Sequence, residues 1–75
     1  MTTLGDRLWY ERKTRRITQT ELGKMCGRSR KAVWRWEHNE ASPSARELAA
    51  IAAALHIDLH WIITGEKYRK RRGKA

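Results

Sequence analysis

Residues 19–37 decide the fold, and they read QTELGKMCGRSRKAVWRWE. Gly27 stands near the middle of this stretch, and glycine accepts the left-handed backbone that follows many helix ends. We therefore expect a turn of about four residues there, between two short helices. Gly23 is small enough to let these helices cross closely. The positions where the pair must pack are apolar: Leu22, Cys26, Val33 and Trp36.

Polar side chains mark where the two helices begin. Thr18 and Glu21 have the spacing of a capping box, in which side chains and backbone N–H groups bond reciprocally. The first helix is therefore predicted over residues 19–25. Ser29 is a suitable N-cap for the second helix, which is predicted over residues 30–38.

Three further helices are predicted outside this stretch. Two of them cover residues 4–14 and 45–55, and a short one lies between Asp58, as its N-cap, and Gly65, as its stop. The helix over 45–55 has apolar residues at helical spacing. Capping boxes begin the two longer helices: Thr3 with Asp6, and Ser44 with Glu47.

The helix over residues 30–38 is predicted to have a buried face and an exposed face. Its inward positions are Val33, Trp36 and Glu37. Trp9 and Trp61 are also assigned to the core. The outward positions hold three cations and one indole: Arg30, Lys31, Trp34 and Arg35.

Composition limits the classes of function. The chain has 75 residues and a formal charge of +9, as expected for a protein that binds a polyanion. Six cations and no acid lie in residues 67–75, so we expect a domain over 1–66 followed by a disordered basic tail. The single cysteine, Cys26, cannot form an internal disulfide. With no zinc-ligand spacing, signal peptide or membrane-spanning stretch, we expect a cytoplasmic protein.

The stretch 19–37, followed by Pro43, resembles the helix-turn-helix of the phage repressor and Cro family. The resemblance spans roughly residues 4–65. It implies an all-helical, five-helix, lambda-repressor-like DNA-binding domain. It further implies a small Cro-like transcriptional repressor that places the helix over 30–38 in the major groove of a pseudo-palindromic operator. Such a repressor would act in a bacterial or phage-infected cell and be associated with the nucleoid.

The resemblance also assigns roles to individual residues. It places Gln19 at a phosphate and against the recognition helix, and it pairs Arg12 with Glu37 in an ion pair. It assigns base reading to Arg30, Lys31 and Arg35. Arginine and lysine can donate to the O6 and N7 acceptors of guanine, so we expect a G·C-containing half-site. The alternative is that these cations are ordinary solvated side chains.

Other residues of this surface have less certain roles. Trp34 either contacts DNA, through sugar or a thymine methyl, or covers Arg30 or Lys31 as a cation–π partner, or lies in a contact between molecules. Arg28 is either a phosphate contact or merely exposed. The remaining candidates for phosphate contact are Ser29, Ser42, Ser44 and Arg46.

Partners follow from the same resemblance. We expect double-stranded DNA and a homodimer, formed in solution or only on DNA, with no membrane, cofactor, metal or small-molecule substrate. The dimer surface is assigned to Leu59, His60 and Ile63, although Leu59 and Ile63 could instead complete the core. An enzyme is not expected. Alternatives are an antitoxin-type protein, which also binds a partner protein, and sequence-independent nucleic-acid binding by the tail.

Overall fold

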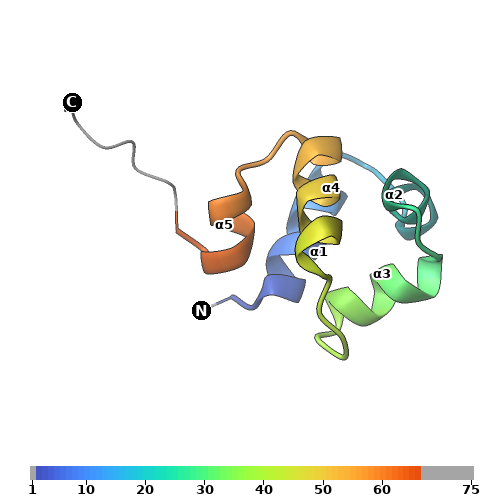
Figure 1. The fold of residues 1–75 in the computed structure, drawn as a ribbon, viewed down its shortest axis with the longest axis horizontal. Coiled ribbons are helices and arrows are strands. Elements are labelled where there is room, and N and C mark those ends of the chain that lie inside the picture. Colours follow the sequence, from blue (N-terminus) through green and yellow to red (C-terminus); the bar gives the residue numbers. More distant parts are fainter. Residues whose placement is uncertain (1, 67–75) are drawn as a thin grey trace.

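The computed structural model describes residues 2–66, and these form five helices and no strand (Figure 1). The prediction of an all-helical, five-helix fold is confirmed, while the predicted tail over 67–75 lies outside the described residues. The helices have the bounds α1 (Leu4–Thr14), α2 (Gln19–Cys26), α3 (Arg30–Glu37), α4 (Ala45–Leu55) and α5 (Leu59–Thr64).

The helices lie around a central pair. Figure 1 shows α1 and α4 in the middle of the molecule, α2 and α3 at one end and α5 at the other. α2 packs on α3 and α4, while α1 contacts both α3 and α5. α1 therefore touches both ends of the molecule.

Capping explains why each helix begins where it does. All three predicted capping boxes are present, at the starts of α1, α2 and α4. Ser29 caps α3 by accepting a hydrogen bond from the backbone of Ala32, and Asp58 caps α5. Gly27 has a φ of 71°, and it ends α2 as predicted.

The close crossing of α2 and α3 depends on Gly23. A Cβ atom at this position would lie 2.5 Å from the carbonyl oxygen of Arg28, which is backbone and cannot move aside cheaply. Any larger residue would push the turn away from α2. The small residue predicted at this crossing is therefore required by its geometry.

All five helices contribute buried apolar side chains to the core. Trp36 is buried, as predicted, but Trp9 is 48% exposed, so its assignment to the core is wrong. The reason is the register of α1, whose inward residues include Leu4, Leu8 and Arg12, so that Trp9 lies off this face. Trp61 is half-buried at the edge of the core. The buried apolar side chains are Leu8, Leu22, Ala32, Val33, Trp36, Ile51, Leu55 and Ile62.

Asn39 joins the end of α3 to the start of α1. Its φ of 58° is left-handed, a conformation that asparagine adopts more readily than most residues. Its side-chain oxygen accepts a hydrogen bond from the backbone of Gly5 at 3.1 Å, and its amide donates to Thr3 Oγ1 at 2.9 Å. Asn39 therefore follows the end of α3 in a left-handed conformation and also connects α3 to α1.

None of the helices within residues 2–66 has the length and apolar character needed to cross a membrane. In the same part of the chain, no three His, Cys, Asp or Glu side chains are grouped as a metal site would require.

Candidate nucleic-acid interface

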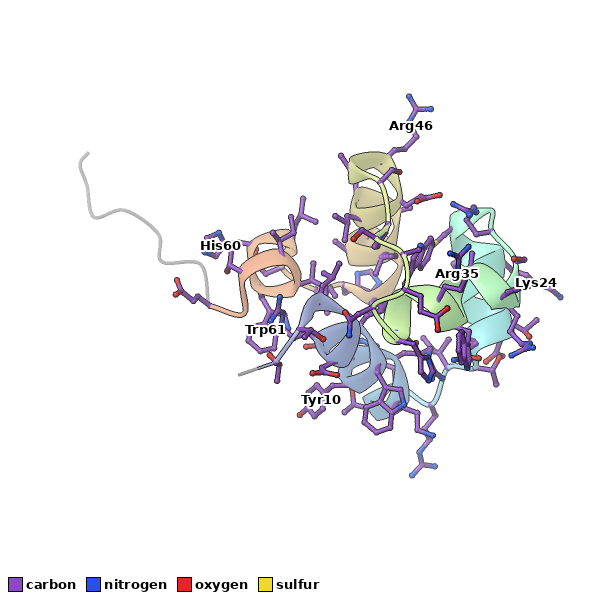
Figure 2. All side chains as sticks on the ribbon, turned by 90° about the horizontal axis from the view of Figure 1, so that it is seen from below. Tyr10, Lys24, Arg35, Arg46, His60 and Trp61 are labelled. Atoms are coloured by element: carbon purple, nitrogen blue, oxygen red, sulfur yellow. The ribbon has the colours of Figure 1, made fainter. Side chains whose placement is uncertain are left out.

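α3 presents a cationic face to the outside of the molecule. Arg30, Lys31, Trp34 and Arg35 are exposed, whereas Ala32, Val33, Trp36 and Glu37 are buried. Figure 2 shows Arg35 on α3 and Lys24 on the neighbouring α2. The only acid paired with an outward cation of α3 in the described chain is Glu40, 4.0 Å from Arg35, and both side chains are about half exposed. This face is therefore open to an anionic partner.

A buried carboxylate fixes α3 against α1. Glu37 accepts hydrogen bonds from Arg12 Nε at 2.5 Å and from Arg12 Nη2 at 3.0 Å. The side chain of Glu37 is 1% exposed and that of Arg12 is 8% exposed. Arg12 Nη1 also donates to the carbonyl oxygen of Ile17 at 2.8 Å. Two fork-like hydrogen bonds set the orientation of α3 as well as its position.

Gln19 continues this network to the outer surface. Its side-chain nitrogen donates to Glu37 Oε1 at 3.0 Å, and its side-chain oxygen accepts from Arg30 Nη1 at 3.3 Å. The first residue of α2 is therefore bonded to both ends of α3. The chain of contacts runs from buried Arg12 to exposed Arg30.

A basic hollow of about 580 Å³ lies beside this network. Its lining includes Lys13 and Arg16, which sequence reasoning did not select, together with Gln19 and Arg30. The signal was the dense run of cations before residue 17, but only the fold brings that run next to Arg30. We refer to the surface formed by Lys13, Arg16, Gln19 and Arg30 as the basic hollow.

Arg28 is neither free nor buried. It forms an ion pair with Glu47, and its guanidinium lies 5.5 Å from the ring centroid of Trp36. This ion pair joins the turn after α2 to the start of α4. Glu47 also accepts a hydrogen bond from the backbone of Ser44, and mainly for that reason its pKa is below the ordinary glutamate value.

The other candidate phosphate contacts surround the α4 end of the surface. Ser29 and Ser44 use their hydroxyl oxygens as N-cap acceptors, and Ser42 is exposed. Arg46 projects from the start of α4 away from the bundle (Figure 2). Arg28 belongs to the same region, because its ion pair with Glu47 joins the turn before α3 to the start of α4.

Trp34 stacks on His38, the residue that follows α3. The ring centroids are 3.8 Å apart, and the planes are inclined by 19°. The indole therefore uses an imidazole of the same helix end, and not Arg30 or Lys31, as its stacking partner. The sequence analysis assigned no role to His38 and did not connect it with Trp34.

α5 lies at the far end of the molecule. Leu59 is 39% exposed and Ile63 is 48% exposed, so neither completes the core, and His60 is also exposed. Arg7 of α1 holds this helix: its Nε donates to the carbonyl oxygen of Ile62 at 3.0 Å. Sequence analysis missed Arg7, because its partners are far away along the chain.

Comparisons with known proteins agree with this geometry. The sequence profile of the family described as Helix-turn-helix matches residues 10–62. The repressor protein C2 of Salmonella phage P22 is 35% identical over 63 residues, which are 84% of this chain and 29% of that repressor. The HTH-type transcriptional regulator DicA of Escherichia coli is 32% identical over 65 residues, covering 87% of this chain and 48% of DicA. The chain thus spans less than half the length of these curated relatives.

Solved structures give the same result. The P22 c2 repressor in complex with a synthetic operator matches with a TM-score of 0.84 and 33% identity, covering 88% of this chain and 100% of that chain. The solution structure of the DNA-binding domain of the same repressor matches with a TM-score of 0.77 and 34% identity, covering 81% and 80% of the two chains. The protein therefore belongs to the helix-turn-helix family of the phage repressor type.

Proposed function

We propose that this protein is a small, Cro-like transcriptional repressor that binds double-stranded DNA sequence-specifically, with α3 in the major groove. The observation that carries the proposal is the exposed cationic face of α3, fixed from behind by the buried Arg12–Glu37 pair. A reading helix must be held rigidly, because discrimination between bases depends on hydrogen-bond geometry. The similar P22 c2 repressor was solved in complex with a synthetic operator.

In this proposal base readout and backbone contacts come from different residues. Arg30, Lys31 and Arg35 donate to guanine acceptors, and Trp34 contacts a base edge. Phosphates are contacted by two groups of residues. One group is the basic hollow; the other consists of Arg28, Ser29, Ser42, Ser44 and Arg46.

Two copies are proposed to bind one operator. A single α3 spans only a few base pairs, so two recognition helices separated by about 34 Å would read the two halves of a pseudo-palindrome. The proposed dimer surface is the exposed side of α5, with Leu59, His60 and Ile63. Two of these side chains are apolar and substantially exposed, as expected for residues covered by a second copy.

The rest of the chain completes the proposal. Residues 1–66 are the DNA-binding domain, and the six cations of residues 67–75 add sequence-independent contacts to phosphates. The proposed location is the cytoplasm, where the nucleoid lies. The proposal requires no cofactor and no enzymatic activity.

The direct test is selection of bound sites from randomised duplex DNA. We expect a pseudo-palindromic consensus with G·C pairs in each half-site, and a specific complex that persists at salt concentrations where random DNA is released. Recovery of no consensus, with equal affinity for all duplexes, would contradict the proposed function. A Gly23→Leu variant, which cannot form the helix crossing, is the negative control.

A further inference from the structure

We propose that His38 positions the indole of Trp34 as a flat apolar platform, and that this platform takes the 5-methyl group of a thymine in the major groove. The inference rests on the proposed function, because it assigns a ligand to one side chain on the reading face of α3. The proposed function gives His38 no contact with DNA, and the inference assigns it the role of holding Trp34 in place.

The imidazole is fixed by two kinds of contact. Its ring stacks on the indole at 3.8 Å, and its Nδ1 lies 2.8 Å from the carbonyl oxygen of Trp34. The same oxygen also accepts the backbone N–H of His38 at 3.0 Å. Because a carbonyl oxygen only accepts, Nδ1 carries the proton in this contact. His38 is therefore hydrogen-bonded to the same residue on which its ring stacks.

Stacking leaves the rest of the indole available to a ligand. Trp34 is 36% exposed even with the imidazole against it. A free indole would lose rotamer freedom on binding, which weakens association, whereas a ring that is already held does not. His38 therefore acts as a positioning residue, and Trp34 is the contacting residue.

The location of Trp34 points to the ligand. It lies three and four residues after Lys31 and Arg30, so the three side chains share one face of α3. Base edges in the major groove offer donors, acceptors and one apolar group, the thymine methyl. The cations match the acceptors of guanine. The indole matches the methyl group.

The test uses DNA that differs only by that methyl group. After the bound site has been selected, each thymine is replaced in turn by uracil, symmetrically in both half-sites, and affinity is measured by fluorescence anisotropy. We expect uracil at one symmetric pair of positions to weaken binding by the wild-type protein about 3- to 10-fold. Trp34→Ala should bind the thymine and uracil duplexes equally.

His38 variants test the positioning role. His38→Ala should reduce the thymine-to-uracil affinity ratio, and His38→Phe, which keeps a flat ring for stacking, should restore most of it. Trp9→Ala is the matched control, because it removes an exposed tryptophan from α1 instead of α3, and it should leave the ratio unchanged. Circular dichroism of each variant establishes that the fold is retained.

The possible outcomes separate this inference from the proposed function. A selected consensus in which no thymine can be distinguished from uracil would overturn the inference while leaving sequence-specific binding intact. A methyl effect that disappears in Trp34→Ala but persists unchanged in His38→Ala would overturn the role of His38. Failure to select any consensus would instead contradict the proposed function.

Discussion

At one end of the molecule α1 holds the α2–α3 pair through Arg12, and at the other end it holds α5 through Arg7. Both arginine residues are buried, with 7% and 6% exposure. Arg12 pairs with the carboxylate of Glu37. Arg7 donates to the carbonyl oxygens of Ile62 and Ile63, and to both oxygens of Thr2, and has no carboxylate partner within residues 2–66.

The difference determines how rigid each end is. A charge pair with two hydrogen bonds fixes α3 in one orientation, and removal of either partner leaves an uncompensated buried charge. At the α5 end the partners of Arg7 are neutral, and the last carbonyls of a helix can be hydrated when their donor is lost. We therefore expect the reading end to be rigid and the proposed dimer end to be more adjustable.

The largest expected effect is that of Arg12→Met. This change leaves the carboxylate of Glu37, whose side chain is 1% exposed, with Gln19 as its remaining side-chain donor. The free energy of unfolding should fall by about 3–5 kcal/mol, and the melting temperature by more than about 10 °C. Thermal unfolding followed by circular dichroism measures both.

The double variant Arg12→Met with Glu37→Leu is the control for this prediction. Because it removes both charges, it should recover most of the lost stability. A double variant no more stable than Arg12→Met alone would show that packing, and not the unpaired charge, causes the loss.

Arg7→Met should have a smaller effect, because it removes a buried charge without leaving another one unpaired. We expect a loss of about 2 kcal/mol from the hydrogen bonds to α5 and Thr2. Hydrogen exchange should show faster opening of α5 and little change in α3. If Arg7→Met costs as much stability as Arg12→Met, the proposed contrast between the two ends is wrong.

The sequence predicted the helices well because their starting signals are local. Each of the three capping boxes is contained within four residues, and Gly27 ends α2 through its own backbone conformation. Such features do not depend on the remainder of the fold. The bounds of the five helices therefore agree closely with the structure.

The missed residues depend on contacts between distant segments. Arg7 acts through carbonyl groups more than 50 residues away, and Lys13 and Arg16 line the hollow beside Arg30 only after the chain has folded. The Trp34–His38 stack depends on side-chain rotamers, which periodicity does not specify. The assignment of Trp9 to the core is wrong because this hydrophobic side chain lies off the buried face of α1.

The smallest expected effect is the pH dependence contributed by Glu47, which joins the turn to α4 through Arg28. Its pKa is lowered in the folded protein, first by the backbone N–H of Ser44, so its contribution is present above the ordinary carboxyl pKa and is lost as the pH falls through the lowered value. Glu47→Gln should reduce the acid-induced loss of stability by about 0.5 kcal/mol. Urea unfolding between pH 6 and pH 3 measures this change in the free energy of unfolding, with Glu66→Gln as the control. Identical pH profiles for wild type and Glu47→Gln would contradict the assignment.

The measurement that tests the central claim most directly is a binding profile across every single-base change in the selected site. For Arg30→Ala we expect preference to be relaxed at one symmetric pair of positions, by about 1–3 kcal/mol. For Gln19→Ala we expect weaker binding to all sequences by a similar factor, because a phosphate contact carries no direct base information. If Arg30→Ala, Lys31→Ala and Arg35→Ala all leave the shape of the profile unchanged, α3 does not read the DNA sequence and the account is wrong.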